Sequence, residues 1–327
     1  LDELFYRLLC TRLDAHFSSW ADWILMLRAK IWNLQSKARA FQIGVRHYDL
    51  GNDLFRAMLD DELIYSCGYW ENASTLHEAQ AAKLELIAAK LQLSPGMTIL
   101  DIGCGWGGAA KYFAKRYKVK VVGITVSEKQ AAYAAHHCRG LPIEIRLQDY
   151  RAVGGEYDRI FSIGMFEHVG RKNYRVYLDT VRKRLVREGM FLLHTIAGNV
   201  SYDSGDAWTE KHIFPNSMLP SAKQIAEASE GIFVLEDVHN FGFDYERTLL
   251  AWFRNFESEW AVLQNRYEER FYRMWKYFLL SYAGAFRARR NQVFQIVFSP
   301  DGVRGGYRAQ RWTPAAAEKS FGVAANQ

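Results

Sequence analysis

Residues 97–108 have the sequence Met97-Thr98-Ile99-Leu100-Asp101-Ile102-Gly103-Cys104-Gly105-Trp106-Gly107-Gly108. Residues 98–102 are typical of a short buried parallel strand, and a helical pattern begins near Ala109. The glycine-rich turn between them lets a ligand approach the backbone and points helix N–H groups at it. The same glycines also satisfy the dinucleotide pattern G-x-G-x-x-G. The glycines by themselves therefore do not exclude a nicotinamide enzyme or a turn that binds no ligand.

Asp101 is the informative residue because it lies inside the strand, just before the turn. A carboxylate there can receive a cationic α-amino group, which favours a ligand that bears an amino acid over one that bears a pyrophosphate. The string resembles the first motif of class I methyltransferases, which bind S-adenosylmethionine. The resemblance implies that this cosubstrate is contacted by Asp101, Gly103, Gly105 and Gly107.

The composition is that of a globular chain with an excess of positive charge. The 327 residues are 49% hydrophobic and carry a net charge of +6, which suits an anionic partner such as a phospholipid surface or nucleic acid. The longest apolar run is too short to span a bilayer, and no signal peptide is visible. The chain has four cysteines, which are Cys10, Cys67, Cys104 and Cys138. They form no C-x-x-C pair, so the sequence predicts neither a zinc site nor another metal site, and a reducing cytoplasm is favoured.

Strand and helix patterns alternate from Met97 onward, which predicts an α/β fold with a doubly wound parallel sheet. The seven expected strands lie near residues 97–102, 119–124, 143–147, 158–163, 189–196, 233–238 and 292–298. Helices are expected near residues 75–92, 108–117, 127–138 and 171–184. The first of them has Ser74 or Thr75 as its N-cap and Glu78 placed for a capping box.

The chain divides into three parts. Residues 1–92 form an N-terminal helical and covering segment, in which an apolar stripe from Trp20 to Leu34 predicts either a membrane-surface helix or a helix packed on the protein. Residues 93–300 form the methyltransferase domain, with a helical insertion at 245–290 that suits a lid or substrate-binding element. Residues 301–327 form a tail that is expected to be partly disordered.

The ends of the second and third strands carry polar residues that suit the rest of a nucleoside. Thr125, Ser127 and Gln130 can hold ribose hydroxyls, although Glu128 keeps the dinucleotide alternative open. Gln148 and Asp149 can pair with the amino edge of an adenine, and Asp149 can equally be a turn or cap residue.

Glu167 and His194 follow the fourth and fifth strands, so both should face the reacting group. A lone histidine at a strand end is more often structural than catalytic. A carboxylate opposite it, with Cys67 and Tyr245 available from covering segments, favours a functional site. His168 is expected to cap or orient its neighbour Glu167.

Several longer motifs resemble the cyclopropane-fatty-acyl-phospholipid synthase family, which also takes in mycolic acid cyclopropane synthases and some N-methyltransferases. They occur in the family's order and include His47-Tyr48-Asp49-Leu50-Gly51-Asn52-Asp53, Tyr65-Ser66-Cys67, Gly164-Met165-Phe166-Glu167-His168, Leu192-Leu193-His194-Thr195-Ile196, Ile213-Phe214-Pro215-Asn216, Asn240-Phe241-Gly242 and Gly284-Ala285-Phe286-Arg287. The resemblance adds Tyr65 and Ser66 to the cosubstrate contacts. It also implies that a smaller N-terminal lipid-associated domain is largely missing.

The resemblance implies transfer of a methylene from S-adenosylmethionine to the cis double bond of an unsaturated acyl chain in a membrane phospholipid. A carbocation forms, loses a proton to bicarbonate and closes to a cyclopropane. Bicarbonate is then held by residues Cys67 and Ile196 through their backbones, and by Glu167, His194 and Tyr245. The implied partner is a phospholipid bilayer rather than nucleic acid, the implied place is the cytoplasm at the inner face of the membrane, and a homodimer is a further hypothesis.

One departure and three alternatives remain. Family members often carry a cysteine where this chain has Tyr282, so a covalent cysteine mechanism there is excluded. The alternatives are a related methyltransferase acting on another lipid alkene or an amine, a nicotinamide dehydrogenase, and a non-catalytic membrane or nucleic-acid binding protein. The last rests on net charge and on the basic run at 182–187, and such runs are usually solvated faces.

Overall fold

The structure is a computed structural model that describes residues 1–11 and 51–311. The apolar stripe expected at residues 20–34 and the end of the tail, 312–327, lie outside the described residues. Among the described helices, none combines the length and the apolar character needed to cross a membrane.

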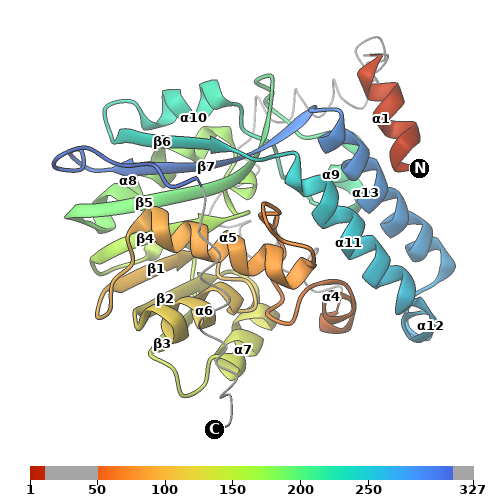
Figure 1. Ribbon diagram of the computed structural model, residues 1–327, viewed down its shortest axis with the longest axis horizontal. Coiled ribbons are helices and arrows are strands. Elements are labelled where there is room, and N and C mark those ends of the chain that lie inside the picture. Colours follow the sequence, from red (N-terminus) through yellow and green to blue (C-terminus); the bar gives the residue numbers. More distant parts are fainter. Residues whose placement is uncertain (12–50, 312–327) are drawn as a thin grey trace, which may run out of the picture.

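A seven-stranded sheet forms the centre of the molecule, with the strand order β3-β2-β1-β4-β5-β7-β6 (Figure 1). Its strands are β1 (Thr98–Ile102), β2 (Lys120–Thr125), β3 (Ile143–Leu147), β4 (Tyr157–Ile163), β5 (Leu185–Gly198), β6 (Val234–Asn240) and β7 (Asn291–Ser299). All seven strands predicted from the sequence are present. The pairs among β1 to β5 are parallel, as predicted, whereas β7 runs antiparallel to both β5 and β6. An apolar run predicts a buried strand but carries no direction, which is why the sequence pattern missed this reversal.

Helices lie against the sheet and beyond one end of it. They are α1 (Asp2–Cys10), α4 (Asn52–Met58), α5 (Leu76–Leu91), α6 (Gly108–Tyr117), α7 (Glu128–His137), α8 (Tyr174–Arg184), α9 (Ala207–His212), α10 (Ala222–Ser229), α11 (Asp244–Ser258), α12 (Trp260–Leu263) and α13 (Glu269–Arg287). The capping box predicted for α5 is present, because the Thr75 side chain accepts from the Glu78 backbone N–H and the Glu78 carboxylate accepts from that of Thr75.

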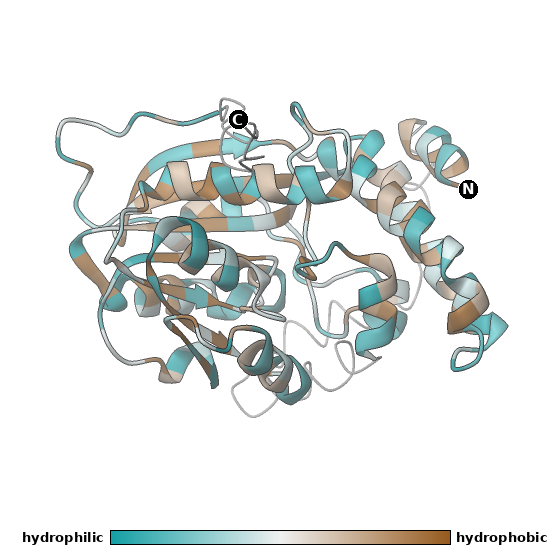
Figure 2. Ribbon diagram, turned by 60° about the horizontal axis from the view of Figure 1, so that its bottom comes forward, coloured by the Kyte–Doolittle hydropathy of each residue, from teal (hydrophilic) through white to brown (hydrophobic). Residues whose placement is uncertain are grey.

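The sheet has a hydrophobic core on each face, as a doubly wound fold requires. On one face Leu84, Ile87 and Leu91 of α5 and Phe113 of α6 are buried against the strands. On the other face the helices α8 and α10 supply Tyr177, Leu178 and Ile225. Figure 2 shows hydrophobic residues along the strands and a mixture of hydrophilic and hydrophobic residues along the helices.

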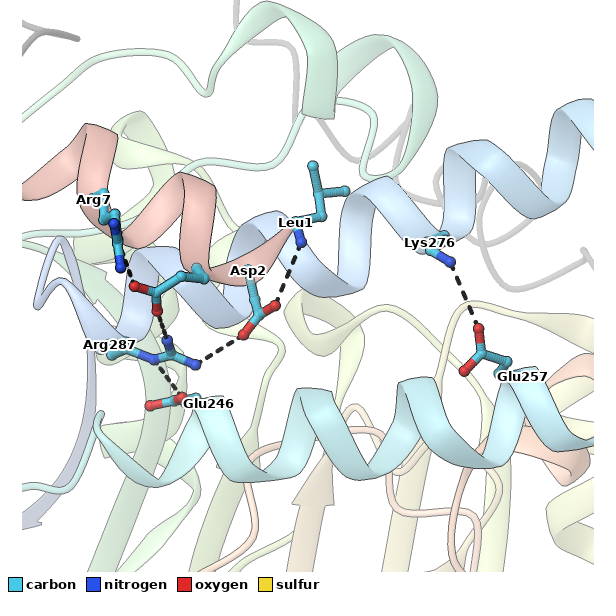
Figure 3. Close-up of polar contacts among 8 residues, drawn as sticks. Leu1, Asp2, Arg7, Glu246, Glu257, Lys276 and Arg287 are labelled. Atoms are coloured by element: carbon cyan, nitrogen blue, oxygen red, sulfur yellow. Dashed lines mark hydrogen bonds and ion pairs between the residues drawn. The ribbon is translucent and has the colours of Figure 1, made fainter.

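The predicted insertion forms the helices α11, α12 and α13, which lie beyond one end of the sheet (Figure 1). Their buried side chains share a third core with residues 54–79. The N-terminal helix α1 packs closely on α13, because a Cβ placed at Gly284 would lie 2.5 Å from the Asp2 carbonyl oxygen. Arg287 of α13 binds Asp2 and Glu3 of α1 and Glu246 of α11, so one guanidinium joins three helices (Figure 3).

Candidate active site

The glycine turn after β1 is enclosed by two other segments. Gly107 has a φ of +87°, and a Cβ there would lie 2.9 Å from the Sγ of Cys138, at the end of α7. At Gly108 a Cβ would lie 2.1 Å from the carbonyl oxygen of Glu62, so the covering segment needs a glycine at this position. Gly107 was expected to contact the cosubstrate, but it packs against α7 and is absent from the walls of the adjacent cavity.

A first cavity lies at the carboxyl ends of β1 to β4, where a doubly wound sheet places its ligands. Ten of the eleven residues expected to contact the cosubstrate line it: Tyr65, Ser66, Asp101, Gly103, Gly105, Thr125, Ser127, Gln130, Gln148 and Asp149. Residues from four strand ends and from the covering segment therefore meet around one space.

Asp101 is buried at the floor of this cavity, with 2% of its surface exposed. Its Oδ2 atom has no hydrogen-bond partner among the described residues. Burial raises the pKa of the carboxyl group to about 8. A buried carboxylate without a counter-charge is costly, and a bound ammonium group would relieve that cost. The site therefore fits the α-amino group of S-adenosylmethionine.

The other end of the first cavity is built from caps and short turns. Asp149 accepts hydrogen bonds from the backbone N–H of Arg151 and from its guanidinium at 2.9 Å. Asp149 is thus the cap residue that the sequence allowed, and it also lines the cavity, while its contact with an adenine stays a prediction. Ser127 caps α7 by accepting from the Gln130 N–H, and the Thr125 hydroxyl donates to the Gln130 side chain at 3.0 Å.

A second cavity, of about 530 Å³, lies between the ends of β4 and β5 and the helices α1, α11 and α13. It shares Tyr65, Ser66, Gly164 and His168 with the first cavity, so the two spaces adjoin there. The five residues expected to hold a proton-accepting anion all line it: Cys67, Glu167, His194, Ile196 and Tyr245.

Glu167 is held by the end of β5. Its Oε1 atom accepts a hydrogen bond from the backbone N–H of Ile196 at 2.6 Å, while Oε2 is buried with no partner among the described residues. Burial raises the pKa of this carboxyl group to about 7. At neutral pH the group can therefore exist in both protonation states. The backbone of Ile196 was expected to hold an anion, and its N–H is engaged by Glu167 in this structure.

His194 is buried beside Gln295, its register partner on β7. The Gln295 amide nitrogen lies 3.3 Å from Nδ1 of His194. Because the amide N–H donates, Nδ1 is assigned as the acceptor and the ring proton as bound to Nε2. Burial, followed by the charges of Lys83 and Lys90, holds the pKa of His194 well below its usual range. A neutral imidazole with an Nε2 proton can donate one hydrogen bond to a ligand in the cavity.

The segment that carries Cys67 is fastened to α11. The Gly68 N–H donates to the Thr248 hydroxyl at 3.0 Å, and the Trp70 N–H donates to the Asp244 carboxylate at 2.8 Å. Burial raises the pKa of the Cys67 thiol well above its usual value, so the sulfur stays protonated. A nucleophilic role for this thiol is therefore disfavoured, which leaves its backbone as the expected contact.

The remaining walls of the second cavity are largely aromatic and aliphatic. Trp252, Tyr277 and Phe278 line it, as expected for the insertion, whereas Phe256 and Trp275 are buried in the core. The hydroxyl of Tyr282 pairs with that of Thr209 at 2.7 Å. The second cavity thus extends from the helices of the insertion to the carboxyl edge of the sheet.

Four wall or support residues were missed by the sequence reasoning. Phe5 and Leu9 of α1 line the second cavity, although nothing in the sequence placed α1 near the strand ends. Gln295 and Lys83 support the site from behind. Their signal was present in the sequence, since each is a polar residue in the middle of an apolar strand or helix pattern.

The strand order, the glycine turn and the carboxylate before it define a class I, S-adenosylmethionine-dependent methyltransferase. Two solved relatives share the fold at 32% identity: the cyclopropane synthase MmaA2 from Mycobacterium tuberculosis, with a TM-score of 0.75, and the mycolic acid cyclopropane synthase CmaA1 complexed with SAH and CTAB, with a TM-score of 0.74. Each similarity covers 79% of this chain and 97% of the other.

Residues 35–296 match the family described as mycolic acid cyclopropane synthetase, and the chain belongs to that family. It is 50% identical over 315 residues to the cyclopropane-fatty-acyl-phospholipid synthase of Escherichia coli K12. The matched region covers 92% of this chain and 82% of the relative. It is 37% identical to the cyclopropane mycolic acid synthase 3 of M. tuberculosis, over 63% of this chain and 78% of the relative. The chain is therefore an enzyme of the methyltransferase class with S-adenosylmethionine as its cosubstrate.

Proposed function

We propose that this enzyme converts the cis double bond of an unsaturated phospholipid acyl chain into a cyclopropane. The observation that carries the proposal is that Glu167, His194 and Tyr245 all line one cavity, which adjoins the cosubstrate cavity at Ser66. An acyl chain suits the aromatic walls, and the polar cluster suits one proton transfer at the junction.

S-adenosylmethionine supplies an electrophilic methyl group. The electron pair of the alkene forms a bond to the methyl carbon, and the carbon–sulfur bond breaks with its pair going to sulfur. The other alkene carbon becomes a cation. Loss of a proton from the new methyl group leaves an electron pair that closes the ring. Water must be excluded because it would trap the cation, and the buried aromatic walls serve that need.

The proton acceptor in this proposal is a bound bicarbonate ion. The Cys67 thiol is protonated, and one oxygen of Glu167 is held by the Ile196 N–H, so we assign to Glu167 the positioning of the acceptor rather than the role of the base. His194 is neutral and is the rival base, although its low pKa makes it a weak one. A small anion is a ligand that suits a cavity lined by a carboxyl, an imidazole and a phenol, since each can exchange a hydrogen bond with it. A protonated Glu167 would donate to the anion, which avoids repulsion between two bare anions.

The bilayer is the proposed source of the acyl chain. The net charge of +6 suits an anionic surface. Val200 and Tyr202 line the second cavity and are more than half exposed, so the rim of the cavity presents apolar side chains to the outside. Peripheral association with the cytoplasmic face and assembly as a homodimer stay predictions.

The test of this function offers the enzyme three acceptors: vesicles of unsaturated phospholipid, vesicles of saturated phospholipid, and a soluble amine. The proposal expects S-adenosylmethionine to be consumed only with the unsaturated vesicles, in buffer that contains bicarbonate. Removing carbon dioxide should abolish most of the activity, and added bicarbonate should restore it. Methylation of the amine, or full activity without bicarbonate combined with its loss in His194→Gln, would contradict the proposal.

A further inference from the structure

Lys83 is a completely buried lysine in the middle of α5. Its Nζ atom donates hydrogen bonds to the hydroxyl of Ser66 and to the side-chain oxygen of Gln80, both at 2.7 Å. The amide of Gln80 in turn donates to the backbone carbonyl oxygens of Ser66, at 2.9 Å, and Ile64, at 3.3 Å. One turn of α5 therefore holds both the backbone and the side chain of Ser66.

Ser66 lies where the two cavities adjoin and lines both of them. Its Oγ atom accepts a hydrogen bond from Lys83, so its own O–H can donate in another direction. A serine polarised from behind by an ammonium group is a stronger donor toward an anion than a serine alone. The ammonium group of Lys83 therefore acts through the Ser66 hydroxyl on the place where the two cavities adjoin.

The cosubstrate brings an anion to this region. Its amino-acid end carries an ammonium group, which Asp101 is placed to receive, and a carboxylate close to it. Among the described residues that line the first cavity, Arg151 is the one lysine or arginine, and it is bonded to Asp149 at the opposite end. In the part of the chain that the structure describes, the wall near Asp101 therefore offers the carboxylate no lysine or arginine, whereas Lys83 lies directly behind Ser66.

We propose that Lys83 is a positioning residue that holds the carboxylate of S-adenosylmethionine through the hydroxyl of Ser66. This inference rests on the site proposed above. It assigns to the lysine a role in binding the cosubstrate and none in the chemical step.

The electrostatic surroundings of Lys83 give the proposal a pH dependence. Burial lowers the pKa of Lys83 to about 7, against the raising influence of Asp60 and Cys67. The nearby imidazole of His194 stays neutral. Lys83 is therefore charged below about pH 7 and loses its charge above it, so its contribution to carboxylate binding should decline as the pH rises. Asp101 acts in the opposite sense, because it becomes anionic above about pH 8. The difference between wild type and a Lys83 variant isolates the lysine.

The experiment compares Lys83→Met with Lys90→Met by calorimetry. Lys90 is a matched control because it is equally buried in the same helix but contacts Asp237 and His239. The two ligands are S-adenosylmethionine and its decarboxylated form. Lys83→Met should weaken binding of the first by at least about ten-fold and leave that of the second nearly unchanged. Lys90→Met should alter neither, and the loss in Lys83→Met should shrink between pH 6 and pH 8.5.

A second variant keeps the test decisive if Lys83→Met does not fold. Ser66→Ala removes the hydroxyl while leaving the lysine, and it should produce the same loss confined to the ligand that has a carboxylate. Equal losses for both ligands would overturn the proposal, since they would show that Lys83 only shapes the segment. Unchanged binding of both ligands in Ser66→Ala would overturn it as well. Failure of the wild type to bind S-adenosylmethionine would instead contradict the cosubstrate itself.

Discussion

The carboxylate of Glu167 accepts a hydrogen bond from the backbone N–H of Ile196, with 2.6 Å between oxygen and nitrogen. The bond joins the short helical turn after β4 to the end of β5. It fixes one oxygen of the carboxyl group and leaves the other inside the cavity region without a partner among the described residues. The group is thereby oriented before any ligand arrives, which is the arrangement expected of a preorganised site.

Glu167→Gln should keep the bond to Ile196 and replace the acidic hydroxyl, which the proposal directs at the bound anion, with a weaker amide donor. We expect kcat to fall by at least about 100-fold, with the affinity for S-adenosylmethionine unchanged. Steady-state kinetics and calorimetry separate the two effects. Glu246→Gln is the control, because Glu246 lies on α11 and binds Arg287. Equal weakening of kcat and of cosubstrate binding would indicate collapse of the site.

Asp101 should make the apoprotein less stable as the pH rises. Its pKa is raised to about 8 in the folded state, against about 3.9 in the unfolded chain, so folding favours the protonated form. The unfolded chain releases its proton first, and stability is lost progressively between about pH 4 and pH 8. Asp101→Asn should remove this pH dependence of stability and weaken the binding of S-adenosylmethionine by at least about ten-fold. Denaturant titrations across that pH range measure the slope, and identical curves for both proteins would contradict the assignment.

Arg287 should hold α1 against the insertion. It is about one quarter exposed and binds three carboxylates (Figure 3), so the network contributes roughly 1 kcal/mol rather than several. Arg287→Met should increase hydrogen exchange in residues 2–10 and raise KM for the lipid, because Phe5 and Leu9 line its cavity. Lys276→Met is the control, since Lys276 lies on the same helix and pairs with Glu257 of α11. Unaltered hydrogen exchange in α1 would contradict this role of Arg287, because it would show that apolar packing alone holds α1 against the insertion.

Tyr282→Phe should leave the chemistry intact. The change removes a hydroxyl pair with Thr209 and costs about 1 kcal/mol of unfolding free energy, while kcat stays close to that of the wild type. Tyr202→Phe, at an exposed position, should cost almost nothing. Thermal unfolding and product assays provide the two readouts. A large fall in kcat without loss of stability would assign Tyr282 to the reaction.

The sequence was most informative where a local pattern determines a local structure. The capping box at Thr75 and Glu78 begins α5 as predicted, and the glycine turn places Asp101 at a strand end as predicted. Parallel strand ends meet at one edge, so Glu167 and His194 could be expected to share a cavity. The antiparallel direction of β7 and the docking of α1 depend on long-range packing, which no local pattern encodes. Lys83 and Gln295 lie behind the site, where a polar residue in an apolar pattern was the only signal.

Ring closure can be distinguished from simple methylation with deuterium in the transferred methyl group. The enzyme is incubated with S-adenosylmethionine that carries a CD3 group and with vesicles of unsaturated phospholipid, and the acyl chains are then analysed by mass spectrometry. Ring closure requires one of the three deuterons to leave, so the account predicts a chain that has gained CD2 and lost its double bond. A chain that retains CD3, with a double bond or a hydroxyl group, would contradict it.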